Sequence, residues 1–261
     1  MKGVSKRRIH EYNQGEWREK EDSFLVEMAL TLEVNGEEFV TMLCSPTDLE
    51  DLVLGFLFSE GLVDGADDLA EFALDERQGR ARVRTRKPHD LAAKLYGKRT
   101  VTTGCGRGTI FYHVTDALKT RRVESDLRVS AEKILAALKG WGEKAELFAE
   151  TGCPHSAALL TAAGELLCLA EDAGRHNALD KVIGRALREG WPRKDKCLVT
   201  TGRISSEMLI KTAKAGIPVV VSRSAATDLA VHLAEELGIT AVGFARGRRM
   251  NVYTHPERIL P

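Results

Sequence analysis

Residues 197–244, CLVTTGRISSEMLIKTAKAGIPVVVSRSAATDLAVHLAEELGITAVGF, decide the fold. In this stretch short apolar runs alternate with longer amphipathic segments, and a glycine follows each amphipathic segment: the runs are 197–200, 218–221 and 240–244, and the segments are 205–215 and 225–237. Short apolar runs between helices are typical of buried strands, and glycine commonly ends a helix. The stretch therefore predicts strands that alternate with helices.

The residues before this stretch extend the same pattern. Ser130 precedes a predicted helix over 131–138, two apolar runs flank Ala163-Gly164 as a hairpin, and 177–188 predict another helix. The order helix, strand, strand, then three helix–strand units predicts a mixed sheet covered by helices on both faces. This α/β arrangement resembles the three-layer cytidine-deaminase fold, and we assign it to a domain over 126–261.

The first half of the chain predicts a smaller α+β domain over 23–125. Apolar runs at 24–34 and 39–43 flank Asn35-Gly36, a strong hairpin signal. Ser45 and Pro46 predict the cap and first position of a helix that extends to about Glu60. The predicted strands that follow are 72–74 and 81–85, and 90–96 predict a short helix. Residues 1–22 are polar and are expected to form a loose arm.

The chain has 38 basic and 38 acidic residues, so its net charge provides no overall field that would attract nucleic acid. The five cysteines lack Cys-x-x-Cys spacing, which indicates reduced thiols rather than a disulfide framework. The basic N-terminus precedes no apolar core typical of a secretory signal, and no apolar run approaches membrane-spanning length. We therefore expect a cytoplasmic protein without membrane insertion.

A single cysteine lies in the glycine-rich stretch Thr102-Thr103-Gly104-Cys105-Gly106-Arg107-Gly108. Glycines at alternate positions leave the thiol no local side chains to be buried against, and the Arg107 charge favours thiolate. Cys105 is therefore a candidate for carrying a group on sulfur. The alternative is a surface loop whose cysteine has no chemical role.

Two predicted helices begin with a glycine and an arginine after a strand. The first start is Gly174-Arg175-His176, and the second is Gly202-Arg203. Free amides at helix starts bind anions, and ligands of α/β sheets bind at that edge. Arg175, His176 and Arg203 are therefore candidate binding residues. The alternative is a pair of ordinary capped helices with solvated arginines.

A third basic cluster follows the last predicted strand, in Phe244-Ala245-Arg246-Gly247-Arg248-Arg249. Guanidinium groups offer paired donors to phosphate, so the cluster suits a phosphate-bearing ligand. A basic solvated turn is the competing interpretation.

The zinc chemistry of deaminases is not expected. Those enzymes hold zinc with a His or Cys at one helix start and Pro-Cys-x-x-Cys at the next. The second start here reads Arg203-Ile204-Ser205-Ser206-Glu207 and contains no cysteine. His176 alone suits a polar contact better than a metal ligand.

The chain resembles the formate dehydrogenase accessory sulfurtransferase family, the FdhD/NarQ type, over essentially its whole length. The matching segments are SPTDLE (45–50), LGF (54–56), SEG (59–61), TGCG (103–106), TGC (151–153), EDAGRHNALDK (171–181), SAAT (224–227) and VYTHP (252–256).

The resemblance implies a deaminase-like core without deaminase chemistry. It implies a homodimer that receives persulfide sulfur from a cysteine desulfurase and delivers it to the molybdenum cofactor of formate dehydrogenase. That cofactor is a bis-guanine-dinucleotide form, so guanine nucleotides are expected to be partial mimics. Our leading hypothesis assigns the sulfur to Cys105, and the cofactor to Phe244–Arg249 together with the helix starts at Arg175, His176 and Arg203.

One position departs from the family pattern Cys-Gly-x-Cys-Gly, because Gly108 replaces the second cysteine. One cysteine is chemically enough for a persulfide, since the outer sulfur leaves and the cysteine is regenerated. The departure nevertheless motivates a second hypothesis, a carrier that binds the cofactor but moves no sulfur. A third hypothesis, a deaminase-type hydrolase, is disfavoured by the missing Cys-x-x-Cys.

Overall fold

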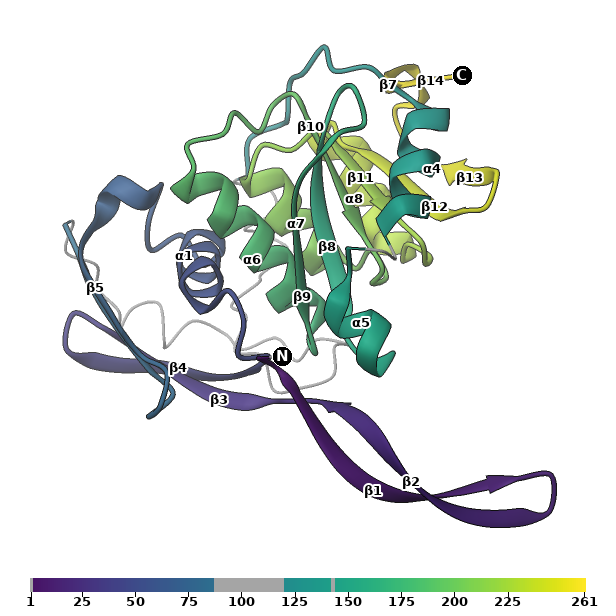
Figure 1. The fold of residues 1–261 in the computed structure, drawn as a ribbon. Coiled ribbons are helices and arrows are strands. Elements are labelled where there is room, and N and C mark those ends of the chain that lie inside the picture. Colours follow the sequence, from purple (N-terminus) through teal and green to yellow (C-terminus); the bar gives the residue numbers. More distant parts are fainter. Residues whose placement is uncertain (1, 87–119, 142–143) are drawn as a thin grey trace.

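A six-stranded mixed sheet forms the centre of the structure (Figure 1), a computed structural model that describes residues 2–86, 120–141 and 144–261. The strand order is β13-β12-β11-β10-β8-β9, in which β10, β11 and β12 are parallel neighbours and the other pairs are antiparallel. Its strands are β8 (His155–Thr161), β9 (Leu166–Asp172), β10 (Lys196–Thr200), β11 (Val219–Ser222), β12 (Thr240–Arg246) and β13 (Arg249–Val252). The predicted α/β class with a mixed sheet is confirmed.

Helices cover both faces of this sheet (Figure 1). They are α4 (Ala131–Gly140) on one face, and α6 (Arg175–Arg188), α7 (Ser206–Lys214) and α8 (Asp228–Leu237) on the other. The period of two along β10 explains this layering: Cys197 and Val199 join the apolar cluster under α4, and Leu198 joins the cluster on the opposite face. The likeness to the cytidine-deaminase fold itself stays a prediction.

A second, four-stranded sheet carries the N-terminal half in the order β4-β3-β6-β5. Its elements are β3 (Met28–Val34), β4 (Glu37–Cys44), β5 (Leu69–Asp75) and β6 (Arg80–Thr85), with helix α1 (Leu49–Ser59) and the short η1 (Ala66–Asp68) between them. The hairpin predicted at Asn35-Gly36 is confirmed, and both residues have positive φ angles, 54° and 88°. The predicted helix over 90–96 lies outside the described residues.

Two predicted helix starts are too early, and at the first of them the expected capping side chain has another partner. Helix α1 begins at Leu49, three residues later than Ser45 suggested. The Ser45 amide instead donates to Oδ2 of Asp172 (3.0 Å), and its hydroxyl accepts from the Ala173 amide (3.1 Å). Helix α8 begins at Asp228 with Thr227 as its cap, three residues later than the predicted segment 225–237.

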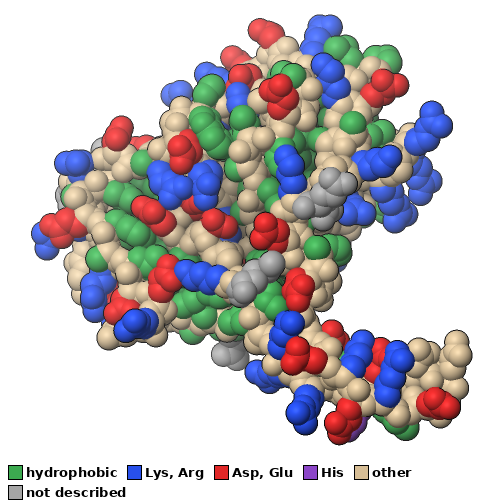
Figure 2. All heavy atoms as spheres, in the orientation of Figure 1, with side chains coloured by type: hydrophobic (Ala, Val, Ile, Leu, Met, Phe, Trp, Pro, Cys, Tyr) green, Lys and Arg blue, Asp and Glu red, His purple; other side chains and the backbone are tan. Residues whose placement is uncertain are grey.

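The expectation of a loose arm over residues 1–22 is wrong for the described part. These residues form most of a β-hairpin, β1 (Val4–Asn13) and β2 (Glu16–Leu25), that projects from the body (Figure 1). Gln14 and Gly15 have φ angles of 51° and 95°, which suit a tight turn between the strands. The many charged side chains of both signs on this arm (Figure 2) obscured its strand pattern.

Short elements complete the described chain: α5 (Glu146–Thr151), β7 (Val129–Ser130), η3 (Pro256–Arg258) and β14 (Ile259–Leu260). No helix among the described residues is long and apolar enough to cross a membrane.

Helices α1 and α6 pack closely because each has a glycine at the contact: Gly55 of α1 faces α6, and Gly184 of α6 faces α1. A Cβ atom on Gly55 would lie 1.8 Å from the Asp180 carbonyl oxygen, and one on Gly184 would lie 1.9 Å from the Asp51 carbonyl oxygen. The Nε of Arg185 donates to Oδ2 of Asp51 (2.5 Å) at the same contact. One cluster of buried apolar residues extends from Leu30 to Ala241, so this core continues across the predicted domain division at residue 125. The division itself stays a prediction.

The glycine contact leads to a stability prediction. Gly184→Ala should lower the free energy of unfolding by about 3 kcal/mol or more, because a methyl group there must push the α1 backbone away. Gly140→Ala is the matched control, since a Cβ at Gly140 meets nothing within 4 Å. Urea unfolding of both variants measures the effect, and equal stability of Gly184→Ala and wild type would contradict the packing argument.

Candidate functional site

The predicted binding residues lie along one edge of the large sheet. Strands β10, β11 and β12 are parallel, and β9 has the same direction because β8 is antiparallel to both β9 and β10. Their carboxyl ends therefore meet at one edge, where ligands of α/β sheets bind. The two helix starts and the Phe244–Arg249 segment all follow strand ends at this edge.

The structure brings the two predicted helix starts into contact. Gly202 lies directly against the Arg175 side chain, since a Cβ at Gly202 would be 2.8 Å from the Cβ of Arg175. Burial lowers the pKa of His155, and the charges of Arg175 and Arg203 lower it further. Both arginines therefore act on the same imidazole and contribute positive charge at this corner of the sheet.

His176 lies in the same corner and is neutral. Burial lowers its pKa to about 3, and the charges of Lys211, Arg175 and His155 act in the same direction. Its Nε2 lies 3.0 Å from Oε2 of Glu207, but the geometry is too bent for a good hydrogen bond. His176 can therefore offer a ligand a hydrogen bond but no charge.

Glu207 is a site residue that the sequence analysis missed. It lies in the first turn of α7, is only 4% exposed, and its Oε1 has no hydrogen-bond partner among the described residues. An acidic residue in a helix's first turn is so common that nothing marked it out. Its distinguishing feature, burial beside His176, depends on two helix starts meeting in space.

The Phe244–Arg249 segment is a strained turn at the other end of the edge. Strand β12 continues to Arg246 rather than ending at Phe244 as expected, with an irregular register between Gly243 and Arg246. Phe244 has a φ angle of 51°, which is costly for an aromatic residue and is typically retained at functional sites. Its amide donates to the Ser224 carbonyl (2.9 Å), which fixes the turn to the loop after β11.

The three arginines of this turn are exposed, whereas Ala245, which precedes them, is fully buried. The Arg246 guanidinium lies 6.0 Å from the centre of the Phe244 ring. Arg248 and Arg249 follow in the hairpin that leads into β13. The apolar side chain anchors the turn, and the charged side chains are directed to solvent.

The two basic groups do not converge on one point. Strand β12 lies two positions from β10 and four positions from β9 in the sheet. At about 4.8 Å between strands, these separations are roughly 10 and 19 Å. The edge therefore suits a long ligand with several anionic groups better than a single phosphate.

A buried polar network fixes the start of α6. The Nζ of Lys181 lies 2.7 Å from Oδ2 of Asp172, and both side chains are fully buried. The other carboxylate oxygen of Asp172 accepts from the Gly174 amide (2.9 Å) and from Nδ2 of Asn177 (2.9 Å). Much of the 171–181 motif therefore positions Arg175 and His176 rather than contacting a ligand.

Two further parts of that motif are also structural. Glu171 accepts hydrogen bonds from the amides of Leu147 and Phe148 (both 2.9 Å), which satisfies the start of α5. Asp180 forms a fully buried ion pair with Lys211 and accepts from the Ser59 hydroxyl. These contacts join β9 to α5, and α6 to α7 and α1.

The candidate sulfur carrier, Cys105, lies outside the described residues. Among the described cysteines, burial raises the pKa of Cys44 and Cys197 to about 12, and that of Cys168 to about 11. These three thiols are therefore protonated at neutral pH and poorly reactive. Cys153 is exposed in the link between α5 and β8.

In the described parts of the chain, no three or more His, Cys, Asp or Glu side chains are grouped so that they could hold a metal ion. The absence of zinc remains a prediction, because part of the chain lies outside the described residues.

Comparisons with known proteins agree on one family. The model of the FdhD/NarQ family matches residues 25–260. The chain is 44% identical over 253 residues to the sulfur carrier protein FdhD of Bacillus subtilis (strain 168), covering 97% of this chain and 96% of that protein. It is 43% identical over 258 residues to the protein of the same name from Listeria innocua, covering 98% of each.

A solved structure agrees with the sequence relatives. The crystal structure of a protein described as a formate dehydrogenase accessory protein, from Desulfotalea psychrophila, matches with a TM-score of 0.81 and 27% identity, covering 98% of this chain and 99% of that one. The family match spans both sheets and the whole basic edge, so the resemblance inferred from the motifs is confirmed. The chain belongs to the FdhD/NarQ family.

Proposed function

We propose that this protein is a cytoplasmic sulfurtransferase that accepts sulfur from a cysteine desulfurase and delivers it to the molybdenum cofactor of formate dehydrogenase. The names of the relatives support sulfur carriage, and the similar crystal structure, that of a formate dehydrogenase accessory protein, supports a role with formate dehydrogenase. The observation that carries the cofactor half of the proposal is the row of arginines and the strained Phe244 along one sheet edge.

Cys105 would hold the sulfur in transit. Its thiolate attacks the outer sulfur of the donor's persulfide, a new S–S bond forms on Cys105, and the donor cysteine leaves as thiolate. When the outer sulfur is passed on, the Cys105 thiol is regenerated. One cysteine is sufficient for this cycle, so Gly108 in place of a second loop cysteine is compatible with it.

The residues at the sheet edge fit a bis-guanine-dinucleotide cofactor as bound cargo. Its phosphates suit guanidinium groups that are spread over roughly 10 to 19 Å, exposed at Arg203 and in the Phe244–Arg249 turn and half-buried at Arg175. The neutral His176 beside Glu207 offers a polar contact. The cofactor supplies the metal centre that receives the sulfur. The residues proposed to hold it are Phe244, Ala245, Arg246, Gly247, Arg248, Arg249, Arg175, His176 and Arg203.

The carrier assignment predicts the behaviour of three cysteine variants. Cys105→Ala should abolish persulfide loading by a cysteine desulfurase and activation of formate dehydrogenase, because no other thiol takes its place. Cys153→Ala and Cys168→Ala should keep both. Intact-mass analysis after incubation with the desulfurase and cysteine measures loading as one added sulfur.

The same experiment tests Gly108. Gly108→Cys, which restores the family pattern, should leave loading and activation essentially unchanged. Added sulfur on Cys153, together with an active Cys105→Ala variant, would show that the carrier has been misassigned.

The cofactor site predicts binding of guanine nucleotides. Arg249→Ala should weaken GDP binding by roughly ten- to a hundredfold, because one charged phosphate contact contributes about 1.5–3 kcal/mol. The melting temperature should stay nearly constant, since the side chain is exposed. Calorimetric titration gives the affinity, and Arg77→Ala is the control on the opposite half of the chain. Unchanged GDP affinity in Arg249→Ala would mean that the basic turn is only solvated.

A cofactor-binding chaperone without sulfur transfer is the second candidate function, and Gly108 is the residue that favours it. GDP binding is common to both candidates, so only persulfide loading on Cys105 separates them. The family resemblance also leads us to propose a homodimer, which native mass spectrometry would detect.

A deaminase-type hydrolase is the remaining alternative, and metal content tests it. Purified protein should contain no stoichiometric zinc, because the α7 start offers Ser205 and Ser206 where that chemistry needs thiolates. Elemental analysis that finds about one zinc per chain, lost on His176→Ala, would restore the hydrolase hypothesis.

A further inference from the structure

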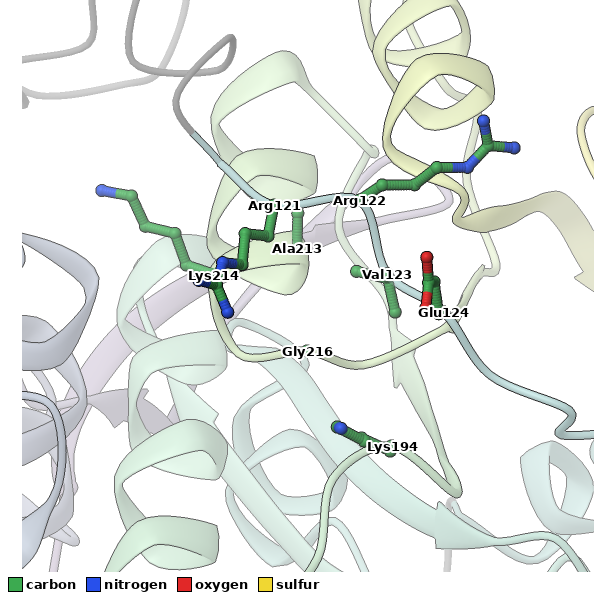
Figure 3. A pocket seen from close by; sticks show the side chains of 8 residues that line it. All are labelled: Arg121, Arg122, Val123, Glu124, Lys194, Ala213, Lys214 and Gly216. Carbon is green, nitrogen blue, oxygen red and sulfur yellow. The ribbon is translucent and has the colours of Figure 1, made fainter.

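A basic hollow lies at the edge of the large sheet opposite the candidate site (Figure 3). It has a volume of about 540 Å³ and lies where the chain enters β10 and β11. Its lining residues come from three segments that are far apart in the sequence: Arg121, Arg122, Val123 and Glu124 from the link before β7, Lys194 from the loop before β10, and Ala213, Lys214 and Gly216 from the end of α7. The proposed function uses none of them.

The hollow has an excess of positive charge. Its described lining includes four basic residues, Arg121, Arg122, Lys194 and Lys214, and one acidic residue, Glu124. Figure 3 shows Arg121 beside Lys214, on the side of the hollow away from Lys194. The described residues include no ion-pair partner for the side chains of Arg121, Arg122 or Lys194. No ion pair with a described residue would therefore have to be displaced by an anionic partner.

A second hollow extends the first into a groove. It has a volume of about 510 Å³ and shares Glu124 and Lys194 with the first. Its other lining residues are Ser125, Asp126, Leu127, Arg128, Ala162 and Asp195, so its charges are mixed. The groove follows residues 121–128, which form neither helix nor strand. It is elongated, with one basic end.

This shape and lining favour a polypeptide over a compact phosphate. Helix α7 ends at the hollow, and the partial negative charge of a helix end opposes a dense anion. The described lining residues include no aromatic ring on which a nucleotide base could stack. Carboxylates spaced along an extended chain match cations that are spread over three segments. We propose that this groove binds an extended segment of a partner protein whose acidic residues meet Arg121 and Lys194.

A labelled hexaglutamate peptide is a direct probe of this groove. Charge reversal in the double variant Arg121→Glu/Lys194→Glu should weaken binding of the peptide to the full chain by about tenfold or more. The control Arg77→Glu/Lys139→Glu makes the same change in net charge at two exposed positions outside the groove, and it should bind within about threefold of wild type. Fluorescence anisotropy gives both affinities. GDP binding by the groove variant should be unchanged. That result would show that the variant is folded and that the proposed cofactor site at the opposite edge of the sheet is intact.

Three results would overturn the proposal. If the wild-type protein does not bind the peptide, the groove is not an acidic-peptide site. Equal weakening in the two double variants shows a response to net charge alone. Inorganic pyrophosphate that displaces the peptide at lower concentration than unlabelled hexaglutamate shows that a compact phosphate is the preferred ligand. None of these results depends on sulfur loading of Cys105. A failure of the groove proposal would therefore not contradict the proposed function.

Discussion

The buried ion pair between Asp172 and Lys181 is the constraint on which the candidate site depends. Both side chains are fully buried, and removal of one partner from such a pair typically costs about 3–5 kcal/mol because the other charge is left uncompensated. The pair is well satisfied here: Asp172 also accepts from the amides of Ser45 and Gly174, and Lys181 donates to the carbonyls of Ser45 and Glu171. It therefore ties the segment before α1, the end of β9 and the start of α6 to one another.

This arrangement explains how a positive site can exist at a sheet edge without losing its shape. Two buried carboxylates behind the edge are neutralised by buried lysines, Asp172 by Lys181 and Asp180 by Lys211. The arginines that face a ligand lie outside this layer, and Arg203 and Arg249 are exposed. Stability and binding thus use different charges. A ligand's phosphates can meet the outer arginines without any rearrangement of the buried pairs.

Sequence reasoning succeeded where one local pattern determines the structure. The alternation in 197–244 predicted strands and helices that the structure contains, and Asn35-Gly36 predicted its hairpin because the turn needs positive φ angles. It failed where a side chain has a distant partner: Ser45 resembles a helix cap but binds Asp172 and Ala173. Glu207 gave no signal because its burial beside His176 is created only when two helix starts meet.

The positions of the two charged regions have a consequence for a carrier. The edge with the candidate site lies at the carboxyl ends of β10 and β11, and the basic groove lies at their amino ends. Strand β10 has five residues, so the two regions are separated by roughly 16 Å of sheet, at about 3.3 Å per residue. A ligand at one edge does not occupy the other. A protein that must hold cargo while it meets a partner needs this separation, because a shared surface would force the cargo to leave before the partner could bind.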